Sequence, residues 1–279
     1  MAMLDEAHYW AETQFGAAEL GDIRRTGRLV STMAAIARAP DESLPRQLGS
    51  LAGAKAAYRL FDCGAVTREA VMDPHLAQCR AEAARHPIVL MVHDDTTLDF
   101  STDRRLQGAG RVGDDHGTGF LAHSCLAVLP SGETLGLAHQ TIWARSPKGV
   151  TRPTRESAVW AETIATIGRP PTRSLFVSVG DRGADVFEHL ESVRDTGWDA
   201  VIRAAQDRRL AAGGGSLTAL RAARAMGAAT VLTRQGEAVV CVAWHELELL
   251  PPRNGPAGRA RRSECRACAS GTTHSNGCC

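Results

Sequence analysis

Residues 87–97 read PIVLMVHDDTT, and this stretch decides the fold class of the chain. It is apolar without interruption up to Val92, which is typical of a buried central strand, and polar residues that include Asp95 follow. Residues 175–182, LFVSVGDR, repeat the layout and place Asp181 directly after a second apolar run. The sequence therefore predicts two buried strands, each with an aspartate at its carboxyl end.

The spacing of apolar residues around these two strands predicts a mixed α/β organisation. Residues 10–75 show helical spacing, which predicts a helical N-terminal region. Strands are also predicted at 121–128, 134–143, 200–203, 231–232 and 238–250, with helices at 156–167 and 184–194. From residue 251 the chain is rich in Arg, Gly, Ser and Cys, and it cannot bury enough apolar surface to fold alone.

Composition limits the function classes. The chain has 279 residues and a net charge of +1, so no global basic field indicates nucleic-acid binding. No run of about 18 apolar residues occurs, and the N-terminus lacks an apolar signal segment, so we expect a cytoplasmic protein with no membrane partner. Apart from Lys55 and Lys148, every basic residue is arginine, which suits phosphate and guanine recognition but also follows from a GC-rich genome.

The cysteines fall into two groups. Four are scattered and are interpreted as reduced core residues: Cys63, Cys79, Cys125 and Cys241. The other four, Cys265, Cys268, Cys278 and Cys279, crowd the end of the chain. A disulfide framework does not divide its cysteines in this way, so the tail differs in origin or purpose from the body.

Carboxylates at the ends of adjacent strands can hold divalent cations for phosphodiester chemistry. Two cations about 3.5–4 Å apart activate a water molecule and stabilise the leaving oxygen. Oxygen ligands favour Mg²⁺ or Mn²⁺. Aspartates at strand ends are also common turn residues, and that interpretation stays open for Asp95 and Asp181.

Five motifs, in order along residues 8–250, carry a resemblance to a known family. They are WAETQF (10–15), LGDIRRTGRL (20–29), AYRLF (57–61), DTT (95–97) and DRGAD (181–185). Together they resemble the IS4-family transposases, the Tn5 type in particular. The resemblance implies N-terminal helices that recognise the transposon end, followed by an RNase H-like domain. In that family, two aspartates and a glutamate cut and rejoin DNA by a two-metal mechanism.

The resemblance assigns roles position by position. Asp95 matches the first catalytic aspartate and Asp181 the second, and both would bind Mg²⁺, with Mn²⁺ as a substitute. Asp94 is then a flanking acid. The residues that match DNA-contacting regions are Arg24, Arg25, Arg28, Lys55, Arg59 and Arg203, although a solvated helix face would explain each basic residue equally well. His93 and Trp160 are interpreted as packing or hydrogen-bonding residues.

The family's third acid lies in a tyrosine–arginine–glutamate–lysine motif on a late helix. The only tyrosines here are Tyr9 and Tyr58, both before the first strand, so that motif is missing. Glu246 and Glu248 are the nearest late acids, but they alternate with apolar residues as on the solvent face of a strand. We therefore expect little or no strand cleavage.

Three regions are expected. Residues 1–75 form an all-α DNA-binding region, residues 76–250 an incomplete RNase H-like α/β domain, and residues 251–279 a disordered tail that fits a frameshift. A competing hypothesis is a zinc site in that tail, formed by Cys265, Cys268, His274 and Cys278 at nearly zinc-knuckle spacing.

The expected function is that of a cut-and-paste DNA transposase that has lost catalysis. Its expected partners are double-stranded DNA of the transposon terminal repeats and an intact transposase. One alternative is a non-catalytic protein that binds transposon ends and competes with an intact transposase. Another is a stand-alone nuclease, which would nick DNA with Mg²⁺ and lose this activity in Asp95→Ala and Asp181→Ala.

Overall fold

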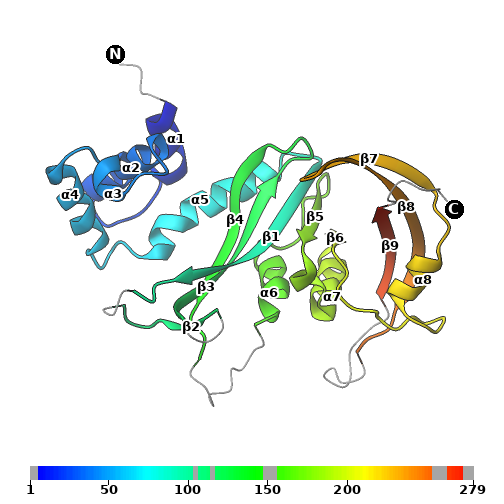
Figure 1. The fold of residues 1–279 in the computed structure, drawn as a ribbon. Helices are drawn as coiled ribbons and strands as arrows, with labels where there is room; N and C mark the ends of the chain where they lie inside the picture. Colours follow the sequence, from blue (N-terminus) through cyan, green and yellow to red (C-terminus); the bar gives the residue numbers. More distant parts are fainter. Residues whose placement is uncertain (1–5, 103–105, 114–116, 147–155, 253–262, 273–279) are drawn as a thin grey trace. The chain divides into compact units, whose positions relative to one another are not determined.

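The computed structural model describes residues 6–102, 106–113, 117–146, 156–252 and 263–272. It has a helical N-terminal region followed by mixed α/β structure (Figure 1). The chain divides into two compact units, Met1–Arg145 with Pro170–Phe176, and Ser146–Arg169 with Val177–Cys279. Within the described ranges, no helix is both long enough and apolar enough to cross a membrane.

The first unit begins with a series of helices, and capping side chains mark the starts of three of them. They are α1 (Glu6–Phe15), α2 (Ile23–Arg38), α3 (Leu44–Gln47), α4 (Leu51–Phe61) and α5 (Arg68–Ala83). Asp22, Ser50 and Thr67 each accept a hydrogen bond from a backbone N–H in the first turn of α2, α4 and α5. Such caps satisfy N–H groups that have no partner inside the helix. They explain why α2, α4 and α5 begin where they do.

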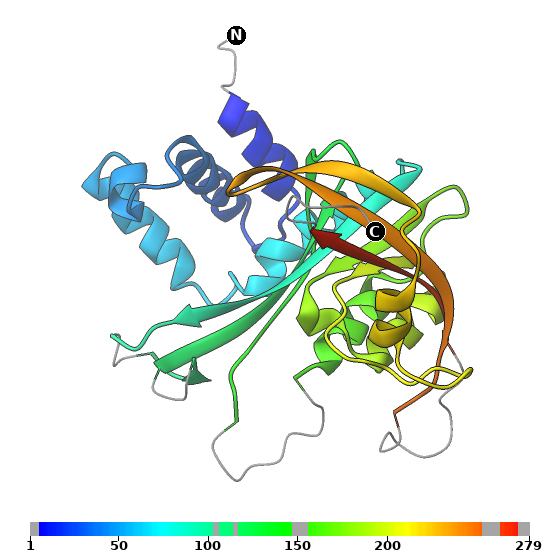
Figure 2. The ribbon, with the colours of Figure 1, turned by 45° about the vertical axis from the view of Figure 1, so that its right-hand side comes forward.

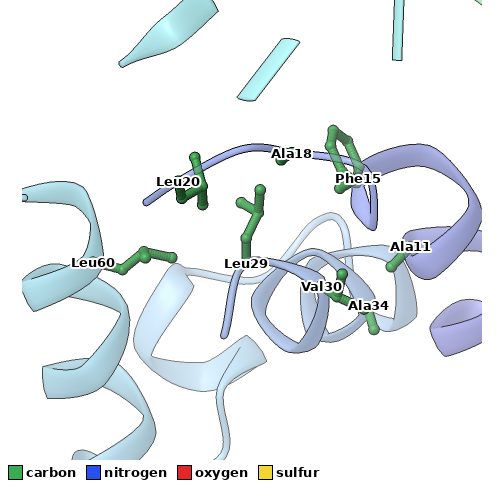
Figure 3. Packing of buried hydrophobic residues seen from close by; sticks show 8 residues of the cluster. All are labelled: Ala11, Phe15, Ala18, Leu20, Leu29, Val30, Ala34 and Leu60. Atoms are coloured by element: carbon green, nitrogen blue, oxygen red, sulfur yellow. The ribbon is translucent and has the colours of Figure 1, made fainter. Parts of the chain in front are cut away.

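A small apolar core holds α1, α2 and α4 together. Its buried members, shown in Figure 3, are Ala11, Phe15, Ala18, Leu20, Leu29, Val30, Ala34 and Leu60. Leu29 and Val30 come from α2, and the Leu29 side chain points toward the loop residues Ala18 and Leu20. Partly buried side chains from the start of α5 pack against this core. The helical spacing of apolar residues in the sequence is therefore borne out in three dimensions.

An antiparallel sheet completes most of the first unit. Its strands are β1 (Ile88–Asp99), β2 (Gly110–Val112), β3 (Gly117–Val128) and β4 (Thr134–Trp143). β3 pairs with β1, β2 and β4, and the turn between β3 and β4 is the predicted hairpin at residues 130–133. α5 packs against β4 and runs beside the sheet (Figure 1).

β1 is longer than the sequence predicts. The apolar run predicts an end at residues 93–95, whereas the strand continues to Asp99 because its ladder with β3 extends to the pair Asp99–Gly119. The buried residues of β1 stop at His93, and from Asp94 onward the strand is mostly exposed. Asp95 therefore lies in the middle of a strand, just beyond the buried half, and the predicted strand-end position is wrong.

The second unit contains a parallel pair of strands with two helices. Its elements are α6 (Ala158–Ile167), β5 (Leu175–Gly180), the 3₁₀ turn η1 (Arg182–Ala184), α7 (Phe187–Thr196) and β6 (Asp199–Ile202). β5 begins in the first unit, and its residues from Val177 onward pair in parallel with β6. α7 connects the two strands and packs against α6. Asp181 directly follows β5, as the sequence predicts.

A curved antiparallel sheet follows (Figures 1 and 2). It is formed by β7 (Gly227–Thr233), β8 (Gly236–Leu249) and β9 (Ser263–Thr272), and α8 (Ser216–Ala222) contacts β8. Leu247 and Leu249 of β8 are buried with Phe187, Leu210 and Leu220. β9 lies within the tail that the composition predicts to be disordered. The difference has a physical reason, because a strand can join the edge of β8 through backbone hydrogen bonds without supplying an apolar core.

Two half-buried histidines lie in the first unit, His75 on α5 and His139 on β4. His75 of α5 lies with Nδ1 2.7 Å from the side-chain oxygen of Gln14, and its Nε2 accepts a hydrogen bond of 3.2 Å from the Leu137 N–H. Burial lowers the pKa of His75. Burial also lowers the pKa of His139 on β4 to about 4, and the nearby cations of Arg80 and Arg68 act in the same direction. Both imidazoles are thus held neutral.

We expect acidification from pH 7 to pH 4.5 to lower the melting temperature by on the order of 5 °C. Both folded-state pKa values lie below the ordinary value of 6.5, so the unfolded chain binds more protons in this interval. The histidine contribution is complete above about pH 6.5 and is lost toward pH 4. Asp22, whose pKa is lowered to about 2 by Arg24, stays ionised throughout. Thermal unfolding of His139→Gln should show a smaller decrease, and an equal decrease would contradict this prediction.

Candidate functional site

Asp95 lies opposite a buried histidine in the β1–β3 ladder. The pairing register places Asp95 across from His123, and Oδ1 of the carboxylate lies 2.6 Å from Nδ1 of the imidazole. The His123 side chain is 0% exposed, whereas that of Asp95 is 50% exposed. Asp94 accepts a hydrogen bond from the Asp95 backbone N–H, consistent with a flanking role. The Asp95 carboxylate is therefore held by the contact with His123, while half of the side-chain surface stays exposed to solvent.

The contact continues into the core through two more buried side chains. His123 Nε2 lies 3.2 Å from His93 Nδ1, and His93 Nε2 lies 3.6 Å from the Cys125 sulfur. All three side chains are at most 3% exposed. Burial raises the pKa of the Cys125 thiol, which keeps it protonated and unreactive. The prediction that His93 is a packing and hydrogen-bonding residue is confirmed.

Asp181 lies on a tight turn supported by the core of the second unit. Its Oδ1 accepts a hydrogen bond of 2.7 Å from the Gly183 N–H and so caps η1. The Trp160 ring, 2% exposed, lies behind this turn. A Cβ on Gly180 would lie 2.5 Å from the Ala184 Cβ and 3.0 Å from Trp160, so only glycine fits there. Trp160 is therefore a core residue, as predicted, and it supports the turn that carries Asp181.

A buried histidine, His189, also supports the turn that carries Asp181. His189 of α7 is 0% exposed, with Nδ1 2.9 Å from the Ala184 carbonyl oxygen and Nε2 3.1 Å from the Ser178 hydroxyl. Its ring lies against Trp160, with 5.5 Å between centroids. The acceptor carbonyl fixes the proton on Nδ1, and the serine hydroxyl then donates to Nε2. η1 is thereby tied to both β5 and α7.

Arg203 is brought close to Asp181 by the parallel pairing of β5 and β6. Gly180 pairs with Ile202, and the Arg203 N–H donates a hydrogen bond of 3.1 Å to the Gly180 carbonyl. Arg203 and Asp181 are therefore neighbours at the carboxyl ends of two parallel strands, where open α/β sheets commonly bind ligands. Both residues are exposed. Arg203 could therefore bind an anionic ligand at this edge, and Asp181 could bind a cation.

The two predicted catalytic aspartates belong to different compact units. Asp95 lies in the first unit and Asp181 in the second, and each site is described on its own. Across the part of the chain that the structure describes, no group of three or more His, Cys, Asp or Glu side chains could hold a metal ion. Mg²⁺ is commonly held by one or two carboxylates together with water and substrate phosphate, so the donor chemistry of Asp95 and Asp181 still suits it.

Basic side chains of the helical region differ in how they are engaged. Arg24 forms an exposed ion pair of 2.8 Å with Asp22, and its hydrogen bonds hold the pKa of that carboxyl at about 2. Arg25 donates to the Leu20 carbonyl oxygen at 2.8 Å and is half-buried. These two arginines already have protein partners that a phosphate would have to displace or share.

Arg28, Lys55 and Arg59 are exposed on the sides of α2 and α4 away from the core. Lys55 and Arg59 are four residues apart and so lie on one face of α4. Tyr58, 48% exposed, lies beside them. Between residues 7 and 66 the sequence holds seven basic and six acidic side chains, so the net charge of this segment is close to zero. Attraction to DNA therefore depends on where the basic side chains lie on these helix faces.

Sequence reasoning missed several supporting residues. His123 and His189 lie on elements that were predicted correctly, but their partners are set by strand register and by a turn. The buried ion pair between Asp185 and Arg208, 2.6 Å apart, was also missed. The DRGAD motif, which ends at Asp185, was the available signal, since a charged residue in a buried setting needs a partner.

The late acids and the tail cysteines have separate positions. Glu246 is exposed and Glu248 half-buried on β8, on either side of the buried Leu247, as expected for alternation along a strand. Cys265 and Cys268 lie on β9, whereas His274 and Cys278 lie outside the described residues. The zinc hypothesis stays a prediction. Of the scattered cysteines, Cys79 and Cys125 are buried, Cys63 and Cys241 are partly exposed, and all four are unbridged.

Residues 7–66, which span α1 to α4, match the family model of transposase DNA-binding domains. The helical region resembles a transposase DNA-binding domain. This match supports a transposase-like DNA-binding role and a DNA partner. It covers the exposed basic residues on α2 and α4 described above.

One solved structure similar to this chain is a piggyBac transposase, determined by cryo-EM as a synaptic complex with hairpin DNA. The sequence identity is 10% and the TM-score 0.40. The match covers 96% of this chain and 52% of that chain, so this chain spans about half the length of that transposase.

Proposed function

We propose that this chain binds double-stranded DNA at transposon ends through the exposed faces of α2 and α4. The observation that carries the proposal is the transposase DNA-binding match over residues 7–66, which contains Arg28, Lys55 and Arg59 on exposed helix faces. Guanidinium and ammonium groups bind phosphates, and an exposed tyrosine such as Tyr58 can add a polar or stacking contact. The IS4-type resemblance makes the terminal inverted repeats the DNA of choice.

The binding test compares a duplex carrying the terminal repeats of the element that encodes this chain with a scrambled duplex. Fluorescence anisotropy should show tighter binding to the terminal repeat at low salt. Replacing Arg28, Lys55 and Arg59 together by alanine should weaken binding at least tenfold and reduce the log–log salt slope by about 3, since each lost phosphate contact removes roughly 0.9. Equal affinity and an unchanged slope in this triple variant would contradict the proposed surface.

Two single variants serve as controls for that measurement. Arg85→Ala removes an exposed arginine on the same unit outside residues 7–66, where it pairs with Glu82 at 2.8 Å. It should leave the salt slope nearly unchanged. Arg24→Ala should have a smaller effect than Arg28→Ala, because the Arg24 guanidinium is already engaged by the Asp22 carboxylate.

We further propose that the α/β part is RNase H-like and that Asp95 and Asp181 would supply carboxylate oxygens to Mg²⁺ or Mn²⁺. The order of elements along the chain supports this: an antiparallel hairpin, a helix, and a parallel strand pair. A bound divalent ion would activate water and stabilise charge on a phosphodiester. In this proposal, His123 holds the Asp95 carboxylate, and the η1 turn holds that of Asp181.

Strand cleavage is expected to be weak, because the third acid of the resembled family is missing. In the described part of the chain, Glu246 and Glu248 alternate along β8 instead of lying on a helix. The chain would then occupy transposon ends and compete with an intact transposase. A nicking assay with Mg²⁺ separates the possibilities: nicking that disappears in both Asp95→Ala and Asp181→Ala would favour a nuclease over a passive competitor.

A further inference from the structure

The Asp95 carboxylate is the exposed end of a linear series of polar contacts that runs into the core. From Asp95 the contacts pass to His123 at 2.6 Å, to His93 at 3.2 Å and to the Cys125 sulfur at 3.6 Å. Asp95 and His93 are two residues apart on β1, so their side chains lie on the same face of the strand. His123 and Cys125 lie directly opposite them on β3. One face of a two-stranded ladder thus aligns all four side chains.

The chemistry of the four groups determines which atom donates the proton and which accepts it at each contact of this series. An ionised carboxylate only accepts hydrogen bonds, so the proton between Asp95 and His123 belongs to His123 Nδ1. A neutral His123 then accepts at Nε2, which places the next proton on His93 Nδ1. His93 accepts in turn at Nε2, where the buried Cys125 thiol is the donor, in agreement with the raised pKa of that thiol. Reversing the direction would require a doubly protonated imidazole in a fully buried position.

We propose that His123 is a positioning residue for Asp95, and that His93 and Cys125 fix the tautomer which lets His123 hold one carboxylate oxygen. Because the Asp95 side chain is 50% exposed, a divalent cation could reach the carboxylate from solvent. This inference rests on the proposed metal-binding role of Asp95. A histidine behind a metal-ligating carboxylate restricts its rotation, and loss of such an outer partner typically costs 10–100-fold in metal affinity.

The first test reads the tautomers in the unaltered chain and needs no variant. Long-range ¹H–¹⁵N NMR of the histidine rings should show His93 and His123 both protonated at Nδ1 near neutral pH. Asp95→Ala should release this constraint on His123 and shift its ring nitrogens. A proton on Nε2 of His123 in the unaltered chain would overturn the inference.

The second test uses two substitutions that differ in where they place an amide N–H. In His123→Asn the side-chain nitrogen takes the position of Nδ1 and can still donate to Asp95. In His123→Gln the nitrogen takes the position of Nε2 and faces His93 instead. With Mn²⁺ as the probe and free Mn²⁺ measured by electron paramagnetic resonance, the glutamine variant should bind at least tenfold more weakly. The asparagine variant should stay within about threefold of the unaltered chain.

The two tests separate failure of the inference from failure of the proposed function. If the unaltered chain binds no Mn²⁺, the metal-binding role of Asp95 is wrong, whatever the tautomers are. If it binds Mn²⁺ and the Asn and Gln variants are equally weakened, the metal role stands and positioning by His123 is overturned. Circular dichroism and thermal unfolding of both variants provide the folding control, because a purely structural role would affect stability without distinguishing Asn from Gln in metal affinity.

Discussion

Asp185→Ala is expected to lower the free energy of unfolding of the second unit by about 3–5 kcal/mol. Asp185 is 6% exposed, and its carboxylate accepts hydrogen bonds from the Arg208 side chain and from the N–H groups of Ala205 and Gln206. The Arg208 side chain is 11% exposed. Removing the carboxylate takes away the counter-charge of the mostly buried guanidinium and the acceptor of two backbone donors, although the guanidinium keeps its hydrogen bond to the Asp185 backbone carbonyl. This loss costs more than the ion pair contributed.

Urea unfolding followed by circular dichroism measures this effect. Asp195→Ala is the matched control, because it removes an acid of the same unit that pairs with Arg194 at 2.9 Å but is 68% exposed. Exposed pairs of this kind contribute about 0–1 kcal/mol. A difference below about 1 kcal/mol between the two variants would show that the buried pair is less isolated from water than its exposure indicates.

Leu29→Ala is expected to destabilise the helical region by about 2–5 kcal/mol and to abolish DNA binding at temperatures where the unaltered chain binds. Leu29 is 0% exposed at the centre of the small core formed by α1, α2 and α4. A core of eight buried residues has few other contacts to compensate for the lost side chain. Since both proposed DNA-contacting helices pack on it, their exposed faces lose their arrangement when it loosens.

The control for this prediction is Leu51→Ala, which changes the same residue type at a position 72% exposed at the start of α4. It should change stability by no more than about 0.5 kcal/mol. Loss of terminal-repeat binding in Leu29→Ala without loss of helical circular dichroism would contradict the explanation by unfolding. Such a result would instead point to a direct effect on the DNA-contacting surface.

Local signals in the sequence predict most of the individual elements. The helical spacing over residues 10–75 and the apolar run before Asp181 are both local patterns, and the structure has helices and a strand where they indicate. β2, α8 and β9 were missed, because each is short or lacks the apolar pattern that reveals an element. The length of β1 was missed for a related reason. Its second half is held by the ladder with β3, a contact that no window of sequence contains.

The candidate site shows the same division. Asp95 and Asp181 could be proposed from the sequence because an acid after an apolar run is a local pattern. His123 could not, because its partner depends on the register between β1 and β3, and a shift of one residue would turn its side chain to the other face. The ion pair of Asp185 with Arg208 joins residues 23 positions apart in the same way. The metal assignment and the DNA-contacting roles stay predictions.

Gly180 gives the second aspartate an unusual evolutionary constraint. A methyl group there would meet Ala184 and Trp160, two residues that also shape the turn after β5. Replacement of Gly180 would therefore require at least two compensating changes, while Asp181 itself tolerates many side chains sterically because it is exposed. Among diverging relatives, we therefore expect Gly180 to be retained more often than Asp181. Related sequences with the glycine and tryptophan but without the aspartate would then have kept the turn while losing the proposed metal-binding carboxylate.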